Sequence, residues 1–113
     1  MQPTERFYEA DAYRKEAASV IMAVQPLEGG GGRVALAGTV FYPEGGGQPA
    51  DRGVLTLPGG TSLSVTDVHE KEGVLWHTVD KLPPDAVPGT PAEERIDWAW
   101  RFDKMQQHTG EHI

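Results

Sequence analysis

The stretch "TSLSVTDVHEKEGVLWHTVD" at residues 61–80 decides the fold class, because two segments of alternating apolar and polar residues flank a short polar turn. Successive side chains of a β-strand point to opposite faces, so residues 61–69 and 73–80 each have the pattern of a half-buried strand. The intervening "EKEG" at residues 70–73 suits a tight turn. This stretch predicts an antiparallel hairpin centred on residues 70–73.

The same alternation continues on both sides of this hairpin. Towards the N-terminus, "SVIMAVQPLE" (19–28) and "RVALAGTVFYP" (33–43) flank the glycines at 29–32, which predicts a second hairpin, and "GVLTL" (53–57) predicts a short strand. The proline-rich "KLPPDAVPGTP" (81–91) predicts a surface loop. After it, "AEERIDWAWRF" (92–102) predicts a strand, with one face formed by Ile96, Trp98, Trp100 and Phe102. The chain is therefore expected to be mainly antiparallel β.

The period of the pattern changes at Asp103. Asp103 is a candidate N-cap, and Gln106 follows three residues later, as in a capping box. Spacings of three and four then place one helical face on Met105, His108, Thr109 and His112. We expect a C-terminal helix starting near Asp103, and a division into a β subdomain at residues 1–102 and the start of a helical segment at 103–113.

Composition limits the function further. The 113 residues suit one small domain, and the net charge of -7 argues against broad non-specific nucleic-acid binding, so that any RNA contact needs a local basic patch. The absence of cysteine excludes disulfides and thiolate metal ligands. The N-terminus does not have the pattern of a signal peptide, and no apolar run approaches the ~20 residues of a membrane span. We expect a cytoplasmic protein with no membrane contact.

The first candidate site is "FYPEGGGQPADRG" at residues 41–53. Its glycines permit positive φ and let a ligand approach the backbone closely. A P-loop would need Gly-Lys-Ser/Thr before a helix, whereas Gln48 and a predicted strand follow here, which argues against a nucleoside triphosphate site. From the residues alone, a purely structural turn and a ligand-binding loop both remain open.

The second candidate site is the pair His108 and His112. Residues four apart on a helix lie on the same face, so the two imidazoles could share one metal ion, although a zinc site usually needs three or four ligands. A solvated helix end is the alternative. His69 and His77 flank the predicted turn at 70–73 and are interpreted as structural or surface residues.

The two candidate sites together resemble the editing region of alanyl-tRNA synthetase and the free-standing AlaX-type editing proteins. The resemblance rests on "FYPEGGGQPADRG", then "WHTVD", then "IDWAWRFDKMQQHTGEHI", and it extends from about Phe7 to Ile113. In the second motif, the matching positions are Arg101, Met105, His108, Thr109 and His112. The resemblance implies a small β-barrel of the kind found in translation proteins, followed by an editing subdomain.

The resemblance also implies a function, namely zinc-dependent hydrolysis of tRNA(Ala) mischarged with serine or glycine. His108 and His112 would be metal ligands, and Gln48 and Thr109 would be catalytic. The backbone of Gly45, Gly46 and Gly47 would face the aminoacyl end. Zinc could polarise the ester or activate a water molecule, and the resemblance does not decide between these roles.

The sequence departs from the family pattern at the second ligand pair, a Cys-x-x-x-His that has no counterpart here. We therefore expect the N-terminal part of an editing protein, which alone binds zinc weakly and is inactive, and which self-associates through the face that the missing subdomain would cover. The alternatives are a non-catalytic β-barrel binding module, an internal segment of an alanyl-tRNA synthetase, and two chains sharing one metal through their terminal helices.

Overall fold

The computed structural model describes residues 2–11 and 13–108. In chain order, these residues form β1 (Glu5–Arg6), α1 (Phe7–Ala10), β2 (Glu16–Pro26), β3 (Gly32–Leu36), β4 (Gly38–Thr39), β5 (Gly53–Thr56), β6 (Ser62–Lys71), β7 (Val74–Val79), β8 (Pro91–Ile96) and α2 (Trp98–His108).

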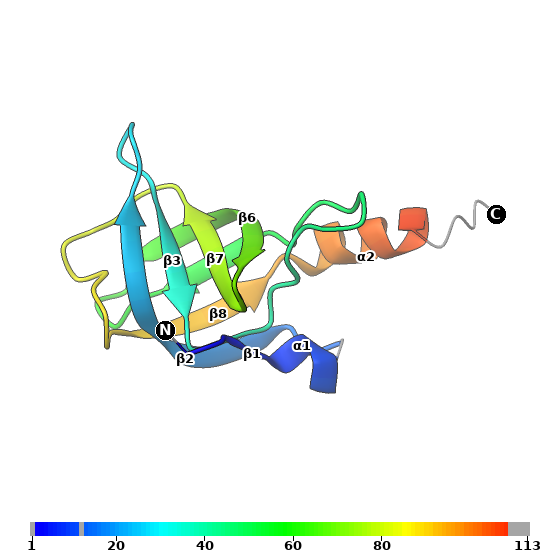
Figure 1. Ribbon diagram of the computed structural model, residues 1–113, viewed down its shortest axis with the longest axis horizontal. Coiled ribbons are helices and arrows are strands. Elements are labelled where there is room, and N and C mark those ends of the chain that lie inside the picture. Colours follow the sequence, from blue (N-terminus) through cyan, green and yellow to red (C-terminus); the bar gives the residue numbers. More distant parts are fainter. Residues whose placement is uncertain (1, 12, 109–113) are drawn as a thin grey trace.

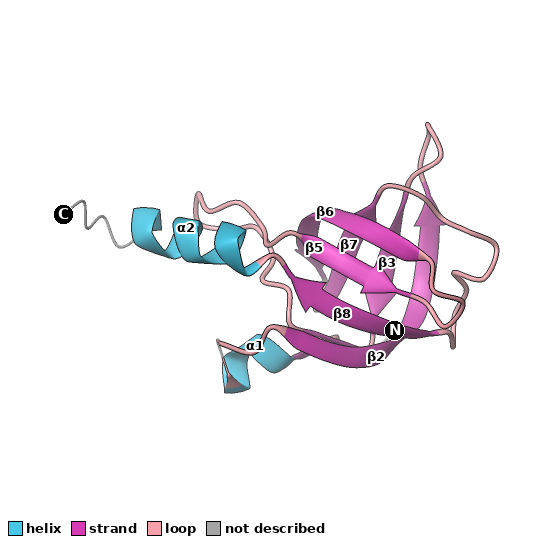
Figure 2. Cartoon of the chain, turned by 180° about the vertical axis from the view of Figure 1, so that it is seen from behind, coloured by secondary structure: helices cyan, strands magenta, loops and turns pink. Residues whose placement is uncertain are grey.

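Six of these strands form a closed barrel in the order β2, β3, β7, β6, β5, β8, and β8 pairs back onto β2 (Figure 2). Each neighbouring pair in the barrel is antiparallel. Closure pairs both edges of every barrel strand, so that no barrel edge is left for another chain to extend. The prediction of a mainly β chain with a small antiparallel barrel and a C-terminal helix is confirmed.

Both predicted hairpins are present. Between β6 and β7, Glu72 and Gly73 have φ angles of 55° and 84°, the sign that a two-residue type I′ turn requires at both positions. Between β2 and β3, Gly29 and Gly30 have φ angles of 90° and 97°. The glycines of the two turns therefore serve backbone geometry.

The barrel interior is filled by one side of each alternating strand. The largest fully buried apolar side chains are Phe41, Ile21, Leu36, Leu55, Leu57, Leu63 and Leu75. The two histidines of the central hairpin separate onto opposite faces: His77 is fully buried, whereas His69 lines a groove on the outside of β6.

The N-terminal residues run along the barrel as a short strap. β1 pairs in parallel with β4, and Thr4 hydrogen-bonds twice to the central hairpin, through its N–H to the Gly73 carbonyl at 3.0 Å and through its hydroxyl oxygen to the Leu75 N–H at 2.9 Å. α1 follows directly after β1 (Figure 1). The strap ties the start of the chain to β4 and β7.

The C-terminal helix begins at Trp98, and the prediction of a start near Asp103 was wrong. β8 ends at Ile96, and the side chain of Asp97 accepts a hydrogen bond from the N–H of Trp100 at 3.1 Å, the contact expected of a helix N-cap. The alternation of Trp98 and Trp100 therefore reflects a helical turn and not one face of a strand. Trp98 is partly buried and packs against the barrel core.

Both helices and the connection between β4 and β5 lie at the same end of the barrel (Figure 1). This arrangement gathers the glycine motif and the C-terminal helix into one region of the molecule. Neither helix in residues 2–11 and 13–108 combines the length and apolar character needed to cross a membrane.

Candidate functional site

The glycine motif folds into a tight hairpin turn at the tip of the β4–β5 connection. Gly45 and Gln48 exchange two backbone hydrogen bonds, of 3.1 and 2.9 Å, and Gly46 and Gly47 between them have φ angles of 58° and 83°. All three glycines are exposed, and a Cβ added at any of them would meet no atom within 4 Å. The turn therefore presents bare backbone to its surroundings.

A buried ion pair holds the base of this glycine turn. The Arg101 guanidinium donates through Nε to both carboxylate oxygens of Asp51, at 2.9 and 3.0 Å, and through a terminal nitrogen to the Val40 carbonyl at 3.1 Å. Side-chain exposure is 3% for Arg101 and 1% for Asp51. The same carboxylate accepts the N–H of Tyr42 at 2.8 Å. One charge pair therefore holds both the segment before the glycine turn, at Tyr42, and the segment after it, at Asp51.

The first turn of α2 is hydrogen-bonded to residues 50–52, the part of the loop that follows the glycine turn. The indole Nε1 of Trp100 donates to the Ala50 carbonyl at 2.8 Å, and the N–H of Asp97 donates to the Arg52 carbonyl at 2.7 Å. The Arg52 guanidinium lies 4.1 Å from the centre of the Trp100 ring. The glycine turn and α2 are thus fixed to one another through side chains and backbone together, as their close approach in Figures 1 and 2 illustrates.

The predicted site residues divide into two groups. Gly45, Gly46, Gly47 and Gln48 lie together in the turn, and Gln48 is half-buried. His108 is the last residue of α2, while Thr109 and His112 lie outside the described residues. The structure therefore brings the turn next to the helix that leads to the predicted metal ligands.

The described residues contain no group of three or more histidine, cysteine, aspartate or glutamate side chains that could hold a metal ion. Imidazole nitrogens suit zinc, and His108 and His112 would supply two ligands of that type. The donor chemistry fits zinc but fills half of a four-coordinate site, so the remaining ligands would have to come from elsewhere.

A second polar cluster lies inside the barrel, around Glu94. Its carboxylate accepts the N–H of Val40 and the hydroxyl of Ser19, each at 2.9 Å. Burial raises the pKa of Glu94 to about 7, against the opposing effect of these hydrogen bonds. That Glu94 faces the barrel interior could be inferred from sequence, because it alternates in phase with buried Ala92 and Ile96.

His77 continues this cluster. Its Nδ1 lies 3.0 Å from the Val34 carbonyl, which can only accept, so Nδ1 carries the proton and Nε2 accepts from the Thr39 hydroxyl at 2.8 Å. Burial lowers the pKa of His77 to about 4, which keeps the ring neutral. Its fixed hydrogen bonds and full burial indicate a structural role.

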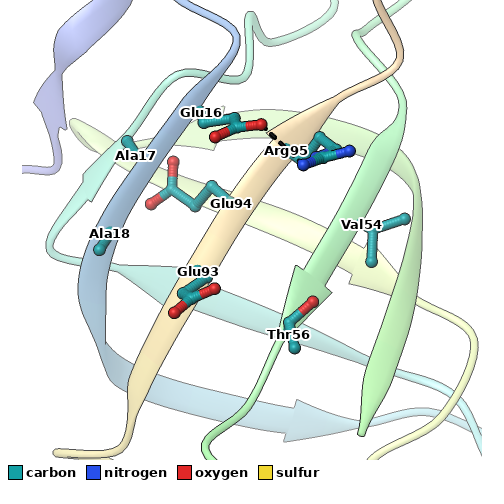
Figure 3. A pocket seen from close by; sticks show the side chains of 8 residues that line it. All are labelled: Glu16, Ala17, Ala18, Val54, Thr56, Glu93, Glu94 and Arg95. Atoms are coloured by element: carbon teal, nitrogen blue, oxygen red, sulfur yellow. Dashed lines mark ion pairs between the residues drawn. The ribbon is translucent and has the colours of Figure 1, made fainter. Parts of the chain in front are cut away.

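A groove of about 520 Å³ crosses β2, β8 and β5 on the outside of the barrel (Figure 3). Glu16, Glu93 and Arg95 line it, and Arg95 is paired with Glu16 at 2.8 Å. With its cation already neutralised and a further carboxylate beside it, this groove is unsuited to a phosphate group.

The chain matches a family of tRNA synthetases and is similar to alanyl-tRNA editing proteins and alanine–tRNA ligases. Residues 8–100 match the family model described as "tRNA synthetases class II (A)". The chain is 38% identical over 111 residues to the alanyl-tRNA editing protein AlaX-M of Pyrococcus horikoshii. The match covers 97% of this chain and 46% of that protein.

Two further relatives agree. The chain is 41% identical over 111 residues to AlaX-L of the same organism, covering 96% of this chain and 26% of that protein. It is 41% identical over 109 residues to the alanine–tRNA ligase of Pyrobaculum neutrophilum, covering 96% of this chain and 11% of that protein. The chain thus spans less than half the length of each of these relatives.

Proposed function

Because the chain belongs to the class II (A) tRNA synthetase family, we propose that it forms the N-terminal part of an alanyl-tRNA editing unit. The unit would hydrolyse the ester that links serine or glycine to tRNA(Ala). The observation that carries this proposal is the clamp of Asp51, Arg101 and Trp100, which holds the glycine turn beside the helix leading to His108.

The chemistry explains why such a unit is needed. A pocket shaped for alanine cannot strongly reject an amino acid that merely adds a hydroxyl group, so a second, hydrolytic site is required. In our proposal, the exposed backbone at Gly46 and Gly47 binds the aminoacyl end, and Gln48 and Thr109 orient the ester. Zinc held by His108, His112 and further ligands would supply Lewis-acid chemistry or a water molecule of lowered pKa.

The 113 residues alone are expected to be inactive. Two imidazoles leave a zinc site incomplete, because such a site usually has three or four protein ligands. The second candidate function is a non-catalytic barrel that binds tRNA for a separate enzyme. Full burial of the clamp is compatible with both functions, so an activity measurement must separate them.

A chimera tests the proposal directly. The aligned part of this chain would replace the corresponding part of AlaX-M, and hydrolysis of seryl-tRNA(Ala) would be measured with added zinc. We expect the chimera to be active and the 113-residue chain to stay at the rate without enzyme. A folded but inactive chimera would favour the non-catalytic barrel.

Single substitutions in the chimera test the assigned roles. His108→Ala and Gln48→Ala should each reduce hydrolysis by a factor of about 10² or more if they hold the metal or orient the ester. Gln2→Ala, at an exposed glutamine near the N-terminus, is the matched control and should leave the rate unchanged. Wild-type rates in both test variants would refute the assignment.

A further inference from the structure

A second groove, of about 350 Å³, lies on the outer wall of β2, β3, β7 and β6. It is lined by Val24, Gln25, Arg33, His69, Lys71 and Trp76. β7 and β8 are three strands apart in either direction around the six-stranded barrel, so this groove and the acidic one across β8 face opposite sides.

Strand register assembles this groove from four strands. Gln25 pairs with Arg33 across β2 and β3, and His69 pairs with Trp76 across β6 and β7. Figure 1 shows β3, β7 and β6 side by side on this wall. The groove therefore stands on paired strands and not on a loop.

The cations of this groove lack acidic partners. Arg33 donates to the Gln25 side chain at 3.3 Å, but its Nε is buried and has no hydrogen-bond partner among the described residues. Lys71 likewise makes no ion pair within residues 2–11 and 13–103, for which side chains are described. A guanidinium without a carboxylate partner can form charge-assisted hydrogen bonds with a phosphate group.

The other described cations, with the exception of Lys81, are occupied. Arg6, Arg95 and Arg101 pair with carboxylates. Cation–π contacts with aromatic rings engage Arg14, Lys15 and Arg52. Among the residues whose side chains are described, the remaining cations are Lys81 and the two of this groove, Arg33 and Lys71. They belong to a chain whose net charge is -7.

The glycine turn lies next to this wall. The N–H of Glu44 donates to the Val68 carbonyl of β6 at 2.8 Å, one residue before His69. An extended ligand that lay in the groove along β6 would therefore run towards the turn at residues 45–48.

We propose that this groove binds the phosphodiester backbone of RNA, with a phosphate between Arg33 and Lys71 and a ribose or base against the indole of Trp76. The contact chemistry is that of guanidinium and ammonium groups with phosphate, beside an aromatic face that tolerates any base. The proposal rests on the proposed function only for the identity of the RNA, which would be the acceptor stem of tRNA(Ala).

The test is binding of a fluorescent RNA hairpin with the tRNA(Ala) acceptor-stem sequence to the 113-residue chain, followed by anisotropy over a series of salt concentrations. We compare Arg33→Gln/Lys71→Gln with Lys81→Gln/Arg95→Gln, which removes the same net charge outside the groove. Circular dichroism checks that both variants keep the strand spectrum.

The groove variant should bind at least about tenfold more weakly at low salt, and its slope of log affinity against log salt should flatten by about 0.7–0.9 for the one phosphate that is no longer neutralised. The control variant should lose less than about twofold. Equal losses in both variants, or an unchanged slope, would overturn the proposal. So would poly-glutamate binding as tightly as RNA, which would indicate an acidic protein partner.

The AlaX-M chimera separates this inference from the proposed function. If the chimera deacylates and the groove variant binds RNA normally, RNA binding by the groove is refuted and the proposed editing function stands. An inactive chimera whose RNA binding still depends on Arg33 and Lys71 would refute the editing function and leave the groove standing.

Discussion

The barrel interior and the junction between the glycine turn and α2 both bury polar groups, but they stabilise them differently. Inside the barrel, Glu94 and His77 are bound by backbone groups and hydroxyls, and one partner of each, Ser19 for Glu94 and Val34 for His77, lies on a strand that already pairs with its own. At the junction, Asp51 and Arg101 form a full ion pair between segments 50 residues apart. The first arrangement is built into the sheet, whereas the second depends on a single pair of side chains.

This difference has a functional consequence. The six barrel strands pair with one another without using the glycine turn. The position of the turn relative to α2 relies on Asp51, Arg101 and Trp100. A substitution at the junction should therefore displace the candidate site as well as lower the stability of the whole chain.

The largest effect is expected for Asp51→Ala. It leaves the Arg101 guanidinium buried without its carboxylate, and removing one partner of a buried ion pair costs about 3–5 kcal/mol. Urea unfolding measures the loss. Glu16→Ala, which removes the carboxylate of the exposed pair with Arg95, is the matched control and should change stability little, because solvent screens exposed pairs.

Adding Arg101→Met to Asp51→Ala should recover part of this loss, because no unpaired charge then remains buried. Equal stabilities of Asp51→Ala and Glu16→Ala would show that the junction contributes no more than a surface ion pair. The contrast between junction and barrel would then fail.

The next largest effect concerns pH, and it uses the two buried titratable groups of the barrel. The pKa of Glu94 is raised to about 7, so the folded state keeps a proton that the unfolded state loses, and stability falls as pH rises from about 4.5 to 7. The pKa of His77 is lowered to about 4, so the unfolded state binds the extra proton and stability rises from about pH 4 to 6.5. The two trends oppose one another.

Removing one of the two titratable groups should therefore reveal the pH dependence of stability that the other group causes. In Glu94→Gln, stability should rise by roughly 3 kcal/mol between pH 4 and 6.5, because only the His77 contribution remains. The wild-type chain should show a much smaller change over the same range. Urea titrations at each pH measure both, and parallel curves for the two proteins would contradict the assignment of Glu94.

The same contrast explains what the sequence could predict. Alternation is local, so the strands and both hairpins were predictable from residues 19–28, 33–43 and 61–80. The boundary between β8 and α2 was missed, because Trp98 and Trp100 imitate a strand pattern while Asp97 provides the helix cap. A capping aspartate directly before the tryptophans was the local signal.

The candidate site was predictable only in part. The glycines and Gln48 were conspicuous as a string, but Asp51 and Arg101 are 50 residues apart, and no local pattern indicates that they pair. The antiparallel pairing of β5 with β8, in which Gly53 lies opposite Ile96, brings them together. Long-range register is therefore what the sequence could not supply.

The smallest expected effect lies within the glycine turn itself, and it tests whether these glycines serve geometry. Gly47 has a φ of 83°, a conformation that costs a residue with a Cβ about 1–2 kcal/mol, so Gly47→Ala should destabilise the turn by that amount. Gly45 does not have positive φ, and its added methyl group would meet no atom within 4 Å, so Gly45→Ala is the matched control. Hydrogen exchange at the Gln48 amide, which donates to Gly45 at 2.9 Å, reports on the turn without requiring global unfolding. Faster exchange in Gly47→Ala than in Gly45→Ala, with the barrel amides unchanged, is the expected result, whereas equal exchange in the two variants would show that the turn does not depend on glycine at residue 47.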